Sequence, residues 1–179
     1  GDDNFRYGIF PGYKKSNKDR RGVEGRKELT QYAIDTMDAI ECHNAETDDW
    51  VCYYKRHNPE YLLVAIDKDV IYQSVGKHYN YWKEEYIEVT EAYARYYKYY
   101  QAIIGDSSDG YKGVPGIGPK KSINFINEWM TDMELQLGVL AAFESKGLSR
   151  EDAELQVQLA DMHQYNPDND ELTLFTFEV

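Results

Sequence analysis

Acidic side chains gather in three short stretches of the sequence, and together they could bind divalent cations. The stretches are AETDDW (45–50), VAIDKDV (64–70) and GDSSDG (105–110). Their candidate metal ligands are Glu46, Asp48, Asp49, Asp67, Asp69, Asp106 and Asp109. Mg²⁺ takes oxygen ligands, typically one or two carboxylates with water and substrate phosphate. These acids could therefore hold two ions, a pair that stabilises the attacking and the leaving oxygen in phosphodiester hydrolysis.

The spacing within each stretch allows its acids to converge. Glu46 and Asp49 lie three positions apart, on one face if the segment is helical. Asp67 and Asp69 follow a predicted strand, and acids at the carboxyl end of a parallel strand lie where α/β folds place their sites. The chain has 32 acidic residues, however, and most acidic residues are solvated. No single stretch therefore establishes a metal site.

The glycine-rich segment GVPGIGPKK (113–121) has the chemistry of a phosphate-binding turn. Gly116 and Gly118 let backbone N–H groups approach a phosphate, and the N-terminus of a following helix adds a favourable dipole. Lys120 and Lys121 place positive charge beside them. Such a contact reads the DNA backbone rather than its bases. The alternative interpretation is a tight turn between packed helices.

The overall charge limits how the chain can contact DNA. The net charge is −12, which argues against a general nucleic-acid coat, because non-specific binding rests on neutralising phosphates. Residues 1–30 hold 8 basic and 5 acidic side chains, whereas 131–179 hold 2 and 11. Any DNA contact should therefore be local and oriented. No membrane span or secretion signal is visible, and two cysteines make no disulfide framework, so we expect a reducing cytoplasm.

Periodicity predicts the elements that position these residues. The run YLLVAI (61–66) suits a strand buried on both faces in a parallel sheet, and ELTLFTFEV (171–179) suits a closing strand. The segment through Arg21 is expected to be loop or mobile arch. Helices are predicted over Leu29, Tyr32, Ala33, Met37 and Ile40, over about Glu46–Arg56 and Thr90–Ile104, in PKKSINFINEW (119–129), and after a Ser149/Asp152 capping box, burying Leu155, Leu159 and Met162.

These motifs resemble, in order, those of the flap endonuclease and 5′–3′ exonuclease family, which includes bacteriophage 5′ nucleases and the 5′-nuclease domain of bacterial DNA polymerase I. GDSSDGYKGVPGIGPKKSINFI (105–126) resembles the family's helix-hairpin-helix, and AIDKDV (65–70) its Asp-Lys-Asp motif. ETDD (46–49) resembles its Glu-Ala-Asp-Asp motif, with Thr47 in place of alanine. NFRYGIFPGYKKSNK (4–18) resembles the segment that leads into its helical arch.

The resemblance implies an α/β fold with a PIN-like parallel-sheet nuclease core, whose N-terminal strand is missing, followed by a helical helix-hairpin-helix DNA-binding segment. Residues 1–104 would form the partial catalytic core with the arch, and 105–179 the DNA-binding and C-terminal helical region. The implied activity is Mg²⁺- or Mn²⁺-dependent cleavage of branched, nicked or 5′-flapped DNA by two metal ions, in replication or repair. The setting would be a bacterium or a phage-infected host cell, with no membrane contact.

The resemblance also implies residue roles. All seven acids named above would be metal ligands, and Lys14, Asp49 and Asp67 would be catalytic. A K⁺ would bind backbone carbonyls near Val114 and Ile117. DNA contacts would come from Arg6, Lys14, Lys18, Gly116, Gly118, Lys120 and Lys121.

One departure from the family keeps alternatives open. The family begins with a strand that carries an early Asp, whereas here Phe5 lies near the start and Asp2 and Asp3 are too close to it to match. We expect either a truncated chain or a separate polypeptide that supplies this strand. A truncated branched-DNA-binding module that does not cut is therefore the alternative function, and an acidic structural protein is a second. The helical tyrosines could stack unpaired bases, although such residues more often pack.

Overall fold

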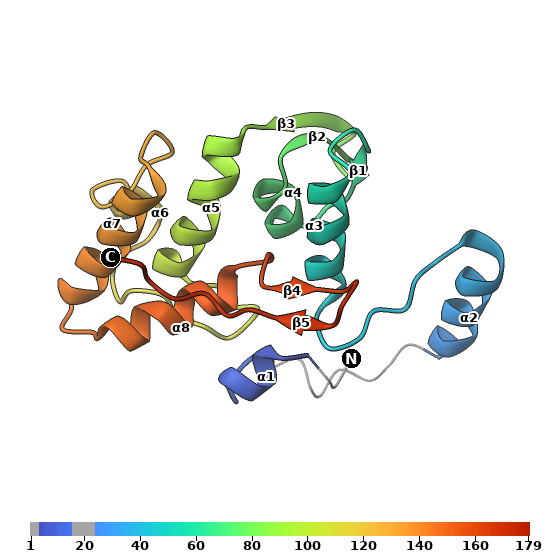
Figure 1. Cartoon of the computed structure of the whole chain (residues 1–179), viewed down its shortest axis with the longest axis horizontal. Coiled ribbons are helices and arrows are strands. Elements are labelled where there is room, and N and C mark those ends of the chain that lie inside the picture. Colours follow the sequence, from blue (N-terminus) through green and yellow to red (C-terminus); the bar gives the residue numbers. More distant parts are fainter. Residues whose placement is uncertain (1–3, 16–23) are drawn as a thin grey trace.

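The computed structural model describes residues 4–15 and 24–179, which form a mixed α/β arrangement (Figure 1). The described elements are α1 (Arg6–Ile9), α2 (Arg26–Met37), α3 (Thr47–His57), β1 (Leu63–Val64), α4 (Lys68–Gln73), β2 (Gly76–Asn80), β3 (Glu85–Val89), α5 (Glu91–Ile104), α6 (Pro119–Ser122), α7 (Asp132–Glu144), α8 (Arg150–Ala160), β4 (Tyr165–Asn166) and β5 (Glu171–Leu172). The α/β class expected from the sequence is confirmed.

The larger sheet has the order β1-β2-β3 and contains one parallel pair. β1 runs parallel to β2, with Leu63 opposite His78, and β2 runs antiparallel to β3, with His78 opposite Ile87. Helix α4 connects the parallel pair and begins directly after Asp67. The carboxyl end of β1 therefore leads into the second acidic stretch, as the sequence predicts.

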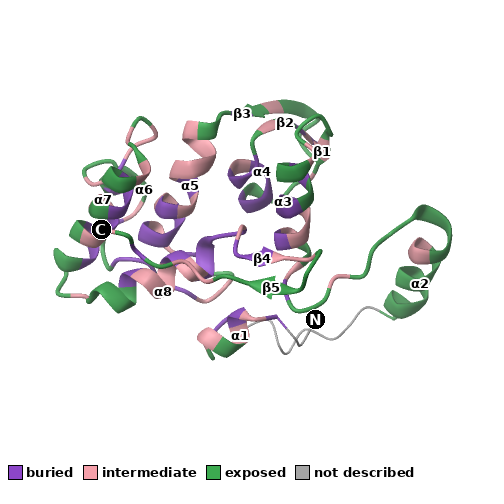
Figure 2. Cartoon of the chain, in the orientation of Figure 1, coloured by how far each residue is buried: buried purple, intermediate pink, exposed green. Residues whose placement is uncertain are grey.

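The main hydrophobic core is built around α5, which begins at its N-cap Thr90. Tyr99 of α5 is fully buried in one cluster with Val139 of α7 and Leu159 of α8. Tyr13, from the opening segment, belongs to the same cluster. Figure 2 shows buried positions along all three helices. The boundary predicted at residue 104 stays a prediction, and this core crosses it.

Two glycines let the chain cross itself at the turn that carries the third acidic stretch. Gly105 and Gly113 both have positive φ, 73° and 59°. A Cβ on Gly113 would lie 2.4 Å from the backbone nitrogen of Gly105, so only glycine permits this approach. The crossing closes the turn between Asp106 and Tyr111, which form an isolated antiparallel bridge.

The strand predicted over residues 61–66 is shorter and more exposed than expected. Only Leu63–Val64 pairs, and the side chains of Val64 and Ile66 are 54% and 51% exposed. Among the described strands β1 has β2 on one side and no neighbour on the other. The prediction of burial on both faces is therefore wrong here, because an apolar run does not reveal what covers it.

Two other elements end earlier than predicted. The helix expected over 119–129 stops at Ser122, and the turn that follows places Ile126, which is fully buried, in the core. The terminal strand is limited to Glu171–Leu172, because Phe175 and Phe177 pack into the core rather than alternate in a ladder. Packing therefore overrides both local patterns.

The predicted Ser149/Asp152 capping box is confirmed. Asp152 donates its backbone N–H to the Ser149 hydroxyl at 3.2 Å where α8 begins. Leu159 is fully buried, Leu155 is partly buried, and Met162 is buried but lies beyond the helix end. No helix in residues 4–15 and 24–179 is long and apolar enough to cross a bilayer.

Helix α2 forms where periodicity predicts it, yet none of its residues is buried (Figure 2). Leu29 and Met37 are 68% and 70% exposed, and Ile40 lies beyond the helix end. Within the segment expected to be loop or arch, α1 forms a single helical turn. Lys18, the predicted DNA contact, lies outside the described residues, as do Asp2 and Asp3.

Candidate functional site

The first acidic stretch forms the N-terminus of α3. Glu46 is the N-cap, and the Asp49 carboxylate accepts the Glu46 backbone N–H at 2.9 Å in a capping box. Asp48 and Asp49 lie in the first turn, where the helix dipole favours negative charge. The acids therefore start the helix, and the helix in turn fixes the position of each carboxylate.

Asp49 is fully buried and is paired with an equally buried arginine. Arg6 Nη1 and Nη2 donate to the two Asp49 carboxylate oxygens at 2.6 and 2.8 Å. Its other bonds run to the backbone carbonyls of Leu159, at 3.1 Å, and Asp161, at 2.9 Å. A guanidinium with 0% exposure cannot offer the DNA contact expected for Arg6, which instead joins α1 to α3 and α8. In this geometry Asp49 supports the site from behind.

Lys14 and Tyr13 connect the first and third acidic stretches. Lys14 Nζ lies 2.7 Å from Glu46 Oε1 and 3.5 Å from Asp109 Oδ1. The Tyr13 hydroxyl reaches the same two carboxylates, at 3.1 Å from Glu46 and 3.0 Å from Asp109. Burial, together with these negative charges, raises the pKa of Tyr13, so its hydroxyl stays protonated. The predicted catalytic lysine therefore lies between two predicted metal ligands.

Lys68 plays the same part between the second and third stretches. Its Nζ lies 3.0 Å from Asp106 Oδ2 and 3.5 Å from Asp69 Oδ1. Asp106 also accepts the backbone N–H of Ser108 at 2.8 Å. Burial alone would raise the pKa of Asp106, but the hydrogen bonds from Ser108 and Lys68 outweigh it and lower this pKa. Asp106 is therefore held ionised.

Asp48 and Asp67 bring the first and second stretches together. Asp67 is the N-cap of α4 and accepts the backbone N–H of Asp69 at 2.8 Å. Burial, with the negative charges of Asp67 and Glu46, raises the pKa of Asp48 to about 7. Burial also raises the pKa values of Asp69 and Asp109. The region therefore holds more negative charge than its own cations balance.

The chemistry of this donor set fits a hard divalent cation. Every candidate ligand is a carboxylate, and a bound cation would relieve the repulsion that raises the pKa of Asp48. As the described side chains stand, no group of three or more His, Cys, Asp or Glu residues is close enough to hold an ion. The ammonium groups of Lys14 and Lys68 lie between the carboxylates instead. Full convergence of seven ligands is therefore not seen in this arrangement.

The glycine-rich segment forms an exposed turn that is held by two buried apolar side chains. Val114 and Ile117 are 2% and 6% exposed, and the Ile117 backbone N–H donates to the Val114 carbonyl at 3.1 Å. Gly116 has φ +76°, whereas Gly118 has φ −105°, and neither has an atom within 4 Å of where a Cβ would lie. Both glycines therefore face open space. Lys120 and Lys121 are exposed, and Lys121 Nζ donates to the Gly116 carbonyl at 3.1 Å.

Two positioning residues, Tyr13 and Lys68, are not among the predicted site residues, although both lie inside the motifs named above. Tyr13 directly precedes Lys14, and Lys68 lies between Asp67 and Asp69. A tyrosine hydroxyl and a lysine beside clustered acids are the signals that could have identified them, because buried carboxylates need donors.

Comparison with known proteins relates the chain to 5′ nucleases. Over 124 residues it is 33% identical to a 5′-3′ exonuclease of Bacillus subtilis (strain 168), and the match covers 66% of this chain and 41% of that protein. The chain therefore spans less than half the length of this curated relative. No family model matches the chain.

Solved structures share its fold. They include a bacteriophage T5 flap endonuclease variant in a pseudo-enzyme–product complex with DNA and metal ions, with a TM-score of 0.67, and T5 5′-exonuclease with bound zinc, with a TM-score of 0.69. Each is 19% identical to this chain, and each match covers 88% of this chain and 70% of the other. Motifs, partial identity and shared fold together confirm that the chain resembles the flap endonuclease and 5′–3′ exonuclease family.

Proposed function

We propose that the chain is a structure-specific 5′ nuclease that hydrolyses DNA phosphodiesters with two Mg²⁺ or Mn²⁺ ions during replication or repair. The observation that carries this proposal is the joining of three acidic stretches around Lys14 and Lys68. The exonuclease relative and the shared fold support it.

The candidate ligands divide according to their accessibility. The Asp49 carboxylate is fully buried in its ion pair with Arg6, so it is not accessible to an ion. The two ions would be held by Glu46, Asp48, Asp67, Asp69, Asp106 and Asp109. Bound cations of this kind lower the pKa of a water molecule and stabilise charge on the phosphate.

Lys14 and Tyr13 perform the protein's own part of the chemistry. Burial would lower the pKa of Lys14, but the Glu46 and Asp109 carboxylates outweigh it, so the ammonium stays charged. It would bind the scissile phosphate and stabilise its developing charge. The Tyr13 hydroxyl holds the Glu46 and Asp109 carboxylates in place. This preorganisation keeps the ligands oriented while DNA enters.

The hairpin would bind the DNA backbone as part of a helix-hairpin-helix. The open space at Gly116 and Gly118 supports close approach of a phosphate to backbone N–H groups, with Lys120 and Lys121 beside it. The carbonyls near Val114 and Ile117 would hold a K⁺. The partners would be branched, nicked or 5′-flapped DNA in the cytoplasm of a bacterium or phage-infected cell.

The uncovered edge of β1 supports a further strand beside it. The apolar side chains of Tyr61, Leu62, Val64 and Ile66 are 46–61% exposed. An unpaired apolar edge is a template for strand addition. We therefore propose that a separate polypeptide or another segment supplies a strand here, and that this strand completes the PIN-like sheet.

The test is cleavage of a 5′-flapped duplex labelled at its 5′ end, with and without Mg²⁺. We expect Mg²⁺-dependent cleavage that Asp67→Asn reduces by at least about a hundredfold, since it removes a proposed ligand. Glu144→Gln, at an exposed carboxylate of α7 outside the three stretches, is the matched control and should leave cleavage unchanged. Equal cleavage by both variants would refute the assigned site.

The alternative is a branched-DNA-binding module that does not cut. The observation that favours it is the lack, among the described residues, of three side chains already arranged around an ion. Salt-sensitive binding to flapped DNA without cleavage in Mg²⁺ or Mn²⁺, even when the upstream strand is added, would establish it.

A further inference from the structure

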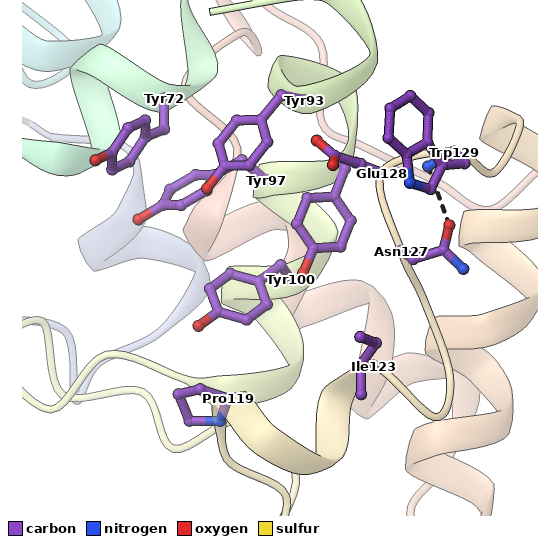
Figure 3. A pocket seen from close by; sticks show the side chains of 10 residues that line it. Tyr72, Tyr93, Tyr97, Tyr100, Pro119, Ile123, Asn127, Glu128 and Trp129 are labelled. Atoms are coloured by element: carbon purple, nitrogen blue, oxygen red, sulfur yellow. Dashed lines mark hydrogen bonds between the residues drawn. The ribbon is translucent and has the colours of Figure 1, made fainter. Parts of the chain in front are cut away.

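A groove lined by aromatic side chains lies between α4, α5 and the segment that follows α6. Its volume is about 510 Å³, within the range of clefts that bind small ligands. Figure 3 shows the labelled tyrosines on one side of a space that Ile123 and Trp129 border on the other, with Pro119 below Tyr100. We call it the tyrosine groove after the side chains that line it, Tyr72, Tyr93, Tyr96, Tyr97 and Tyr100.

The rings form a continuous aromatic surface that is not sealed in the core. Tyr72 and Tyr97 have centroids 5.1 Å apart, and Tyr97 and Tyr100 have centroids 5.8 Å apart. Four of the five tyrosines are partly exposed, and Trp129 on the opposite side is 83% exposed. Aromatic side chains that only fill a core lose their solvent contact, so part of this aromatic surface is accessible to a ligand.

The groove joins the two parts of the proposed nuclease. At one end the Tyr97 hydroxyl lies 3.4 Å from Asp69 Oδ1, a candidate metal ligand. At the other end Pro119 begins α6, which carries the exposed Lys120 and Lys121. The groove therefore lies beside both the carboxylate region and the basic residues of α6.

The charges favour a nucleic-acid strand over other occupants. Among the described residues that line the groove only Glu128 is charged, so the groove itself would repel phosphate and accept an uncharged group. The lysines of α6 supply the positive charge just outside it. A neutral aromatic surface beside basic residues matches bases beside phosphates.

We propose that the tyrosine groove binds unpaired bases of a DNA strand by stacking, as that strand passes between the hairpin and the carboxylates. This inference rests on the proposed nuclease function and specifies which part of the substrate this surface contacts. Stacking tolerates any base, because every base has a π-face. The groove therefore selects single-stranded character rather than sequence.

Two equally exposed tryptophans provide a matched test. Trp129 lines the groove, whereas Trp82, 81% exposed, lies in the turn between β2 and β3. The full chain would be titrated, in chelator and at fixed salt, against a 5′-flapped duplex with 2-aminopurine in the unpaired arm and against a blunt duplex. We expect Trp129→Ala to weaken flap binding about tenfold and to leave blunt-duplex binding unchanged. Trp82→Ala should change neither.

A second pair of variants separates stacking from packing. Trp129→Phe keeps an aromatic face and should retain most of the affinity and of the 2-aminopurine quenching. Tyr100→Leu keeps apolar volume but removes the ring, so it should weaken flap binding while the melting temperature stays near that of the wild type. Equal losses on flap and blunt duplex, or no loss for either Trp129→Ala or Tyr100→Leu, would overturn the proposal.

Binding and cleavage are measured separately, so the two proposals can fail independently. Selective flap binding through Trp129 without Mg²⁺-dependent cleavage would leave the groove in place and remove the nuclease function. Mg²⁺-dependent cleavage together with unchanged flap binding by the groove variants would support the nuclease function and overturn the stacking proposal. Loss of binding to a protein partner instead of DNA in the Trp129→Ala variant would also overturn the stacking proposal.

Discussion

The carboxylate site and the glycine hairpin differ in how they are held. The carboxylates are fixed by contacts between distant segments, such as Arg6 with Asp49 and the Tyr13 hydroxyl with Asp109. The tip of the glycine hairpin is a local turn, in which Ile117 N–H donates to the Val114 carbonyl, and Gly116 and Gly118 face open space. The carboxylate site is buried and charged, whereas the tip of the hairpin is exposed and presents backbone groups.

This difference predicts different responses to mutation. Removing one partner from a buried ion pair leaves a desolvated charge, so changes at the carboxylate site should affect folding as well as chemistry. A change at Gly118 should affect DNA binding and spare the fold, because no other atom lies within 4 Å of where its Cβ would be. Three experiments test this contrast, from the largest expected effect to the smallest.

Arg6→Met should have the largest effect on stability. It leaves the Asp49 carboxylate, which is fully buried, without its two guanidinium donors. We expect the free energy of unfolding to fall by about 3–5 kcal/mol, measured by urea denaturation. Arg56→Met, at an exposed arginine, is the control and should change it little.

A double variant isolates the pair itself. Arg6→Met with Asp49→Leu replaces both charges by apolar groups, so it should recover much of the loss. A double variant as unstable as Arg6→Met alone would show that the arginine acts through its bonds to Leu159 and Asp161 rather than through Asp49.

The same contrast explains how much of the site the sequence could predict. The acids Glu46 and Asp67 lie where local rules on helix starts and strand ends place them, at the N-caps of α3 and α4. The turn at 113–118 follows from local rules on glycine. The burial of Arg6 does not follow, since it depends on the carbonyls of Leu159 and Asp161, more than 150 positions away. Caps and turns can be predicted from neighbouring residues in the sequence, whereas a contact between distant segments cannot.

The fold shows the same limit. Helices with strong caps, such as α3 and α8, lie where the sequence predicts them. The run 61–66 was predicted to be a doubly buried strand, but burial depends on neighbours that the run itself does not encode. The helix expected past Ser122 ends there, and Ile126, which lies beyond its end, is fully buried in the core.

The second experiment uses the pH dependence of the carboxylate site. The pKa of Asp48 rises to about 7 on folding, from its ordinary value of 3.8, because of burial and the charges of Asp67 and Glu46. The folded state then binds more protons than the unfolded state between these values, so stability falls as pH rises and stays low above pH 7. In chelator, we expect the wild type to lose about 1 kcal/mol between pH 6 and pH 8.

Asp48→Asn serves as the control for this titration. The variant should lack this pH dependence and be more stable than the wild type at pH 8 in chelator. Burial lowers the pKa values of His78 and His163, which favours the fold at higher pH, but both proteins share this contribution and it cancels. Adding Mg²⁺ at pH 8 should stabilise the wild type more than the variant. Identical stability–pH profiles for the wild type and Asp48→Asn would show that the Asp48 carboxylate does not interact with the other acids of the site.

The smallest effect on folding is expected at the hairpin, where two glycines differ in backbone conformation. Gly118 has φ −105°, which valine adopts freely, whereas Gly116 has φ +76°, where a side chain is strained by about 1–2 kcal/mol. Gly118→Val should therefore leave the melting temperature unchanged and still weaken binding to nicked duplex, because its side chain enters the space proposed for the phosphate. Gly116→Val should lower both. The loss for Gly118→Val should be the same across DNA sequences, since a backbone contact carries no base information. A loss that depends strongly on DNA sequence would indicate base readout. Unchanged affinity would show that the hairpin is only a turn and that, of the two regions compared, only the carboxylate site contacts DNA.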